Sequence, residues 1–154
     1  HHAFSNMDEC MRILNQHSGL LGVSEVSRDM RKIEREATSN PQAALAIKMF
    51  VKRICDYIGS YWLELGGADA LVFTGGIGEN DNHLRELISE HLNCLGIKFQ
   101  SVQNQSHSQS FDFATRDSQA RLLVIPTDEE LMIARDAYEL ISVEQSLSKP
   151  AINY

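Results

Sequence analysis

The segment FTGGIGEN, Phe73 to Asn80, places three glycines within four positions, directly before a carboxylate and an amide. Glycine lets a backbone approach a ligand closely, and the free N–H groups at the start of a helix attract phosphate. The spacing differs from G-x-G-x-x-G, and no Lys-Ser or Lys-Thr pair follows, so the segment matches neither the dinucleotide motif nor the Walker motif. Two interpretations remain open at this point: a nucleotide-binding turn, or glycines that only make a tight connection between a strand and a helix.

A second group of polar residues lies in PTDEELMIARD, towards the end of the sequence. Thr127 and Glu130 fit a capping box, which accounts for both as a helix start. Asp128 and Glu129 fall outside that explanation, and they follow an apolar, strand-like run at 122–125. Because ligands bind at the carboxyl edge of open α/β sheets, a glycine turn and a free carboxylate at this edge predict a metal–nucleotide pair.

Helices and short strands must position these two groups of residues. Helical spacing and capping residues predict helices over 5–16, about 28–36, 41–65, 82–95 and 128–141, with a glycine-bounded turn at 18–22. Apolar, β-prone runs predict strands over 70–74, 97–102 and 122–125, and polar residues predict a mobile loop over 103–110 and a frayed tail after 142. Helical crossovers predict an α/β fold with parallel strands covered by helices.

Side-chain types also predict where the helices begin and which faces they bury. The expected helix N-caps are Ser5 or Asn6, Ser27, and Asn40, which is followed by Pro41 as the first helical residue. Apolar stripes predict two buried faces: Ile47, Val51, Ile54, Ile58, Tyr61 or Trp62 and Leu65 in the helix at 41–65, and Leu84, Leu87, Ile88, Leu92 and Leu95 in the helix at 82–95.

The composition is that of an ordinary globular domain, and it narrows the range of partners. The 154 residues are 43% hydrophobic and 23% charged, with a formal net charge of −7. That charge argues against nucleic acid or an anionic membrane as partner, and no apolar run approaches the roughly 20 residues of a membrane span. Three widely spaced cysteines favour buried, reduced thiols in a cytosolic protein. The start, His1-His2-Ala3, has no initiator Met and suggests a tagged, excised or processed piece.

Three separated motifs resemble, in the same order, those of the acetate and propionate kinase family: SGLLG with the following Asp29-Met30-Arg31, FTGGIGEN, and VIPTDEELMIARD. The resemblance runs from about Asn15 to Ile141 and covers the C-terminal part of such an enzyme. It implies an actin-like ATPase fold of two lobes, in which residues 1–154 form one nucleotide-binding fragment of the C-terminal lobe. The helix at 128–141 is then expected to pack toward the missing N-terminal lobe.

The same resemblance implies an activity and a set of site residues. The family transfers the γ-phosphoryl group of ATP to acetate or propionate, giving an acyl phosphate and ADP, and it runs the reverse reaction. Its ATP-binding positions correspond here to Asp29, Met30, Arg31, Gly76, Ile77, Gly78, Glu79 and Asn80. Glu129 corresponds to the Mg²⁺ site, and Asp128 stands beside it where the family usually has Asn. The family's catalytic residues and carboxylate pocket belong to its N-terminal portion, so no catalytic residue is assigned within this chain.

A cytoplasmic enzyme that is a homodimer at full length is the setting that the resemblance implies. A non-enzymatic nucleotide-binding or assembly module of the same fold is the alternative, and turnover of ATP with acetate or propionate distinguishes the two. A Rossmann dehydrogenase is a third interpretation, against which the glycine spacing argues. The choice between acetate and propionate depends on the acyl pocket, which the resemblance places outside this chain.

Overall fold

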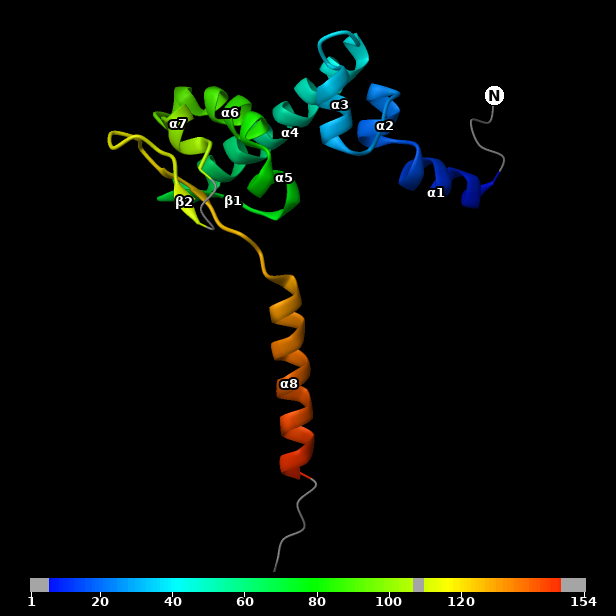
Figure 1. Ribbon diagram of the computed structural model, residues 1–154. Helices are drawn as coiled ribbons and strands as arrows, with labels where there is room; N and C mark the ends of the chain where they lie inside the picture. Colours follow the sequence, from blue (N-terminus) through cyan, green and yellow to red (C-terminus); the bar gives the residue numbers. More distant parts are fainter. Residues whose placement is uncertain (1–5, 107–109, 148–154) are drawn as a thin grey trace, which may run out of the picture.

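The computed structural model describes residues 6–106 and 110–147, so Ser5, the centre of the predicted loop at 103–110 and the end of the predicted tail lie outside the described residues. A compact body of helices and a small sheet carries one long helix that projects away from it (Figure 1). In chain order the elements are α1 (Met7–Gln16), α2 (Gly19–Ser24), α3 (Met30–Glu36), α4 (Pro41–Leu65), β1 (Ala70–Phe73), α5 (Gly75–Asn80), α6 (Asn82–His91), the 3-10 helix η1 (Leu92–Leu95), α7 (Ser101–Asn104), β2 (Phe111–Asp112), β3 (Arg121–Val124) and α8 (Glu129–Leu147).

The sheet is mixed, with the strand order β1-β3-β2. Strands β1 and β3 pair in parallel, as predicted, and β2, which the sequence analysis did not predict, runs antiparallel to β3. The predicted strand at 97–102 was wrong: Phe99 makes one isolated bridge with Ala114, and α7 begins at Ser101. Arg121 and Asp112 form an ion pair of 2.6 Å between β3 and β2, which fixes the unpredicted antiparallel pairing.

Helix α4 forms the framework against which α2, α3 and α6 pack. It begins as predicted, because the Asn40 side chain accepts the backbone N–H groups of Gln42 and Ala43. Ile47 and Val51 are buried, and Ile54, Ile58 and Trp62 pack beside them, whereas Tyr61 and Leu65 are exposed. The predicted stripe therefore holds to Trp62 and fails at the last residue of the helix.

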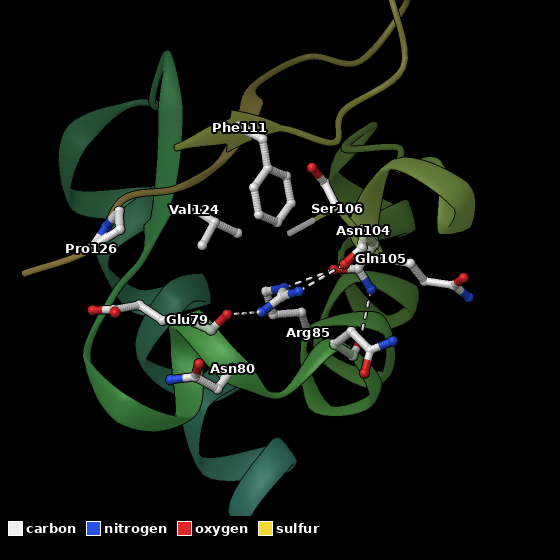
Figure 2. Close-up of a pocket in the computed structure, with 10 residues that line it drawn as sticks. Glu79, Asn80, Arg85, Asn104, Gln105, Ser106, Phe111, Val124 and Pro126 are labelled. Carbon is white, nitrogen blue, oxygen red and sulfur yellow. Dashed lines mark hydrogen bonds between the residues drawn. The ribbon is translucent and has the colours of Figure 1, made fainter. Parts of the chain in front are cut away.

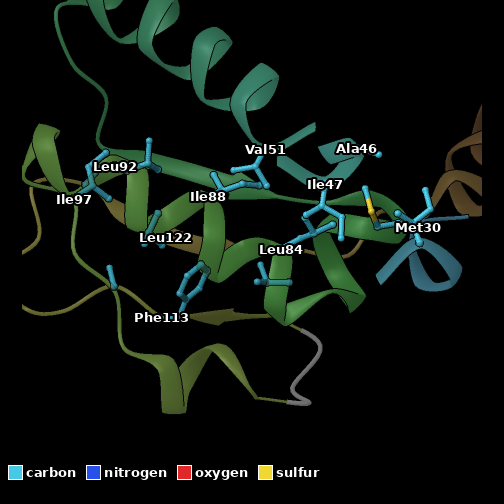
Figure 3. Packing of buried hydrophobic residues seen from close by; sticks show 14 of the residues in the cluster. Met30, Ala46, Ile47, Val51, Leu84, Ile88, Leu92, Ile97, Phe113 and Leu122 are labelled. Carbon is cyan, nitrogen blue, oxygen red and sulfur yellow. The ribbon is translucent and has the colours of Figure 1, made fainter. Parts of the chain in front are cut away.

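The core lies where α4 and α6 meet α3 and the sheet (Figure 3). Leu84, Ile88 and Leu92 supply the buried face of α6 and η1, which the spacing predicted, and Leu87 and Leu95 are partly buried. Burying each such side chain stabilises the fold by about 1.5–3 kcal/mol relative to exposure. Met30 and Ile33 anchor α3 in the same cluster, which fixes the position of the neighbouring Asp29.

Two predictions near the N-terminus need correction. The segment at 18–22 is not a turn: it opens helix α2, because Leu20 and Val23 pack against the core and their burial outweighs the glycine content. Helix α3 is capped by Asp29 rather than by Ser27, whose hydroxyl instead accepts the backbone N–H of Asp29. Asn6 caps α1, in agreement with the prediction.

Surface properties of the described residues add two findings. All three cysteines are free, but Cys94 is exposed and the other two are only half-buried, so the prediction of buried thiols was wrong for Cys94. Within 6–106 and 110–147, no helix combines the length and the apolar character needed to cross a membrane.

Candidate functional site

The glycine segment forms a short helix, α5, rather than the predicted turn. Gly75 has a φ of 71°, a left-handed conformation that favours glycine, and its N–H donates to Glu79 Oε1 at 2.8 Å. A Cβ at Gly78 would lie 3.2 Å from the carbonyl carbon of Phe73, so this glycine lets α5 pack tightly on β1. A Cβ at Gly76 would meet no atom within 4 Å, which shows that this glycine faces open space.

The beginning of helix α3 is held by one carboxylate. Asp29 Oδ1 accepts the backbone N–H of Arg31 at 3.1 Å and caps the helix. The Arg31 guanidinium also donates to the Asp29 carboxylate, with Nε 3.0 Å from Oδ1 and Nη2 2.7 Å from Oδ2. This side-chain bond is the main cause that lowers the pKa of Asp29, so the pair stays charged at neutral pH.

The two predicted ATP-binding segments meet in one pocket of about 590 Å³. The pocket is lined from the α3 side by Arg28, Asp29, Met30, Arg31 and Glu34, and from α5 and α6 by Gly76, Ile77, Asn80, Asp81, Asn82 and His83. The volume lies within the range of small-molecule sites, about 300–1,000 Å³. Segments 45 residues apart in sequence, from Arg31 to Gly76, thus form the walls of a single cavity.

Two of the predicted ATP-binding residues, Gly78 and Glu79, are absent from the lining of this pocket. Glu79 turns to the opposite side of α5, where its Oε1 also accepts the backbone N–H of Thr127 at 2.9 Å and the Thr127 hydroxyl at 3.2 Å. The bond from the Thr127 backbone is the largest cause that lowers the pKa of Glu79, and the bond from Gly75 adds to it. Glu79 therefore joins α5 to the segment between β3 and α8.

Arg85 of α6 is a site residue that the sequence analysis missed. It is only 3% exposed, and it donates to the carbonyl oxygens of Gly78 and Glu79, both at 2.9 Å. On its other side it donates to the side-chain and backbone oxygens of Asn104, both at 2.7 Å (Figure 2). The signal in the sequence was its place on the apolar face of the helix, three residues before Ile88, where an unpaired cation is costly.

Arg85 also lines a second, more polar pocket of about 440 Å³, shown in Figure 2. Phe111 and Val124 form its apolar side, and Glu79 and Pro126 lie at its edge. The Arg85 guanidinium lies 5.6 Å from the centre of the Phe111 ring, a cation–π distance. The bonds from Arg85 hold the C-terminal end of α5, while Gly76 lines the first pocket.

Glu129, the predicted magnesium position, is the first residue of α8 and is exposed. The predicted capping box was wrong, because Asp128 Oδ1 accepts the backbone N–H of Leu131 at 2.9 Å and Thr127 is engaged by Glu79. Among the residues that the structure describes, no three His, Cys, Asp or Glu side chains gather as a metal site.

Comparisons with known proteins agree on one family. Residues 2–135 match the Acetokinase family. "Acetate kinase 1" of Latilactobacillus sakei is 48% identical over 134 residues, and the acetate kinase of Fructilactobacillus sanfranciscensis is 44% identical over 136 residues. These matches cover 87% and 88% of this chain, and 34% of each relative. The chain thus spans about a third of the length of the curated relatives it matches.

Solved structures of the same group share the fold. The acetate kinase of Porphyromonas gingivalis aligns with a TM-score of 0.79 and 38% identity, over 88% of this chain and 35% of that one. A propionate kinase from Francisella tularensis aligns with a TM-score of 0.75 and 37% identity, over 84% and 33%. The predicted α/β fold of the actin-like ATPase type is confirmed, with a mixed sheet in place of a parallel one.

Proposed function

We propose, since the chain belongs to the acetokinase family, that it supplies the adenosine-binding and magnesium-site segments of an ATP-dependent carboxylate kinase. The proposed enzyme phosphorylates acetate or propionate to the acyl phosphate and runs the reverse, ATP-forming reaction. The observation that carries this proposal is the single pocket in which the start of α3 and the α5 helix meet. We further propose that the full-length protein is cytoplasmic and works as a homodimer.

Within this pocket, each segment has a distinct role in binding adenosine. Gly76 leaves open space for the nucleoside, and Ile77 presents a partly exposed apolar side chain beside it. Asn80 adds a polar side chain, although its amide N–H already donates to the Gly76 carbonyl at 2.9 Å. Asp29 and Arg31 form the opposite wall as a mutually oriented charged pair.

Glu129 is the proposed contribution of this chain to the Mg²⁺ site. The ion, when bound with the nucleotide, neutralises charge on the phosphates during phosphoryl transfer. Glu129 offers one exposed carboxylate at the start of α8, and the bond from Thr127 to Glu79 holds that start next to α5. Asp128 uses one carboxylate oxygen to cap the helix, which leaves Glu129 as the freer of the two acids.

The transfer step also needs groups that we assign to the remainder of the enzyme. Phosphoryl transfer requires an in-line attacking oxygen and cationic groups around the equatorial oxygens. The chain covers about a third of its relatives, and we propose that the acyl pocket and the catalytic residues lie in the rest of the protein. Helix α8 is proposed to pack against that rest.

Gly76→Val in the full-length enzyme tests the placement of the nucleotide. A valine at this position meets no protein atom near its Cβ, so the fold should tolerate it, while its branches enter the space assigned to adenosine. We expect ATP affinity to fall about tenfold or more, which is at least ~1.4 kcal/mol, measured by calorimetry.

The matched control is Gly59→Val, on helix α4, where a Cβ also meets nothing within 4 Å and no nucleotide is proposed. This variant should bind ATP as the wild type does. Equal ATP affinities for the wild type and a well-folded Gly76→Val enzyme would reject the proposed site.

A further inference from the structure

Glu34 of α3 carries an unusual carboxyl group at the nucleotide pocket. The residue lines the pocket, but its Oε1 atom is buried and has no hydrogen-bond partner among the described residues. Asp81 lines the same pocket, and both its charge and a hydrogen bond between the two side chains raise the pKa of Glu34. A buried carboxylate oxygen without a partner is costly, whereas a protonated carboxyl that donates to a neighbouring carboxylate is not.

The surroundings place the shared proton on Glu34. Asp81 Oδ1 already accepts the backbone N–H of Leu84 at 2.9 Å and caps α6, so this side chain acts as a hydrogen-bond acceptor. Burial, followed by the charge of Asp81, raises the pKa of Glu34, and His83 acts in the opposite direction. The remaining charged residues around the pocket are Arg28 and the mutually paired Asp29 and Arg31.

The two walls of the pocket have few other direct links. Helices α3 and α6 both pack on α4, but they make little contact with each other. Glu34 extends from α3, and Asp81 is the residue that both ends α5 and caps α6. A bond between these two side chains therefore connects the wall that contains Asp29 with the wall that contains Gly76.

We propose that a proton shared between Glu34 and Asp81 fixes helix α3 against the α5–α6 junction and so sets the width of the nucleoside pocket. Glu34 is a positioning residue: it acts through the placement of the two walls. The inference rests on the proposed nucleotide function of this pocket, and it adds a way in which pH changes the affinity of the pocket for the nucleoside.

The sign of the pH dependence follows from the direction of the shift. A carboxyl with a raised pKa keeps its proton in the binding form, so its contribution is complete at acid pH and is lost as the pH rises through the pKa of Glu34. Above that point, two carboxylates face each other across the pocket and repel. Nucleoside affinity should therefore decrease as the pH rises.

Calorimetric titration of the full-length protein with adenosine tests this inference. Adenosine is the probe because it lacks phosphates, which themselves titrate near neutral pH. For the wild type we expect affinity to fall about threefold or more between about pH 5 and about pH 8. Glu34→Gln should bind adenosine with little pH dependence, because an amide donates to Asp81 at any pH.

Three further variants separate this pair from other titrating groups. Asp81→Asn keeps the helix cap, since Asn is an equally good capping residue, and it should hold its affinity to higher pH because its amide donates to a charged Glu34. Glu36→Gln changes an exposed acid on the same helix, and it should keep the wild-type profile. His83→Gln should also keep a falling profile, which excludes the histidine as its source.

The outcomes distinguish this inference from the proposed function. Adenosine binding with a flat wild-type profile, or a wild-type slope in Glu34→Gln, overturns the inference and leaves the nucleotide site in place. No adenosine binding to the folded wild type at any pH overturns both. A falling wild-type profile that Glu34→Gln abolishes and Glu36→Gln retains supports the shared proton.

Discussion

Glu79 makes its described hydrogen bonds within the protein, although it belongs to the segment that resembles an ATP-binding motif. The resemblance to the kinase family assigns it to ATP, but its Oε1 accepts three hydrogen bonds, from Gly75 and from the backbone and hydroxyl of Thr127. These bonds hold the glycine segment as a helix and fix the segment that leads to Glu129. The motif is thus divided: Gly76, Ile77 and Asn80 line the pocket, while Gly78 and Glu79 position them.

Glu129 and Glu130 provide a test of the magnesium position at the start of α8. Both are exposed and neither caps the helix, so the substitutions Glu129→Gln and Glu130→Gln should cost similar, small amounts of stability. If Glu129 contacts the ion, only Glu129→Gln in the full-length enzyme should raise the Mg²⁺ concentration needed for half-maximal activity, by about tenfold. The measurement is the rate of acyl phosphate formation across a Mg²⁺ titration; equal curves for the two variants would argue against a metal role.

Helices α5, α6 and α7 are joined by a single buried cation. Arg85 donates to the last carbonyl groups of α5, where the helix dipole is negative, and to Asn104 of α7. The planar guanidinium suits this task because it directs several N–H groups to separate acceptors at once. Asn80 lines the pocket between α3 and α5. Its position therefore depends on Arg85, which does not line that pocket.

Arg85→Met should destabilise the chain by about 2–4 kcal/mol, because it leaves buried carbonyl and amide oxygens without donors. Arg85→Lys should recover only part of this loss, since an ammonium group lacks the fork geometry. Urea unfolding of the full-length protein measures these changes in the free energy of unfolding. Arg53→Met, at an exposed position on α4, is the matched control and should stay within about 0.5 kcal/mol of the wild type. An equally small effect at position 85 would show that Arg85 is dispensable.

The long helices and the parallel strand pair could be predicted because local signals and burial agree there. Asn40, Pro41 and Gly66 mark the ends of α4, and the apolar run at 70–73 becomes β1. The short elements could not be predicted, since tertiary contacts determine them: in α2, Leu20 and Val23 are partly buried against the core, and in α5, Glu79 accepts the Gly75 N–H. The resemblance identified most of the residues that line the pocket. The roles of Arg85 and Glu34 and the contact of Thr127 with Glu79 arise between segments that are far apart in sequence, and helical or strand spacing gives no information about such contacts.

At the scale of the whole molecule, α8 lies apart from the body of the described chain. It projects from the body in Figure 1, and many of its described apolar side chains are exposed: Leu131, Met132, Ile133, Tyr138, Leu140 and Ile141. Exposed apolar surface of this kind marks an interaction site. We propose that the remainder of the enzyme covers this surface. This chain spans only about a third of the length of its relatives, so the proposed remainder is large enough to do so.

The isolated 154-residue chain should therefore show no phosphoryl transfer with ATP, Mg²⁺ and acetate or propionate. Reacting groups must be held in near-attack geometry, so the loss of one side of the cleft removes activity rather than reducing it slightly. The exposed apolar residues should also make the isolated chain self-associate, which light scattering measures. Adding the remainder of the protein should restore turnover and suppress association. Turnover by the chain alone, at rates near those of a complete kinase, would place the reaction centre within these residues.

The bond between Glu79 and Thr127 has a mechanical consequence for α8. The helix has 19 residues, which makes it about 28 Å long, and its only described hydrogen bonds to α5 lie just before its first turn. A rotation of such a helix by about 10° at its base displaces its far end by about 5 Å. A small shift of α5, transmitted through the bonds between Glu79 and Thr127, is therefore enlarged at the far end of α8.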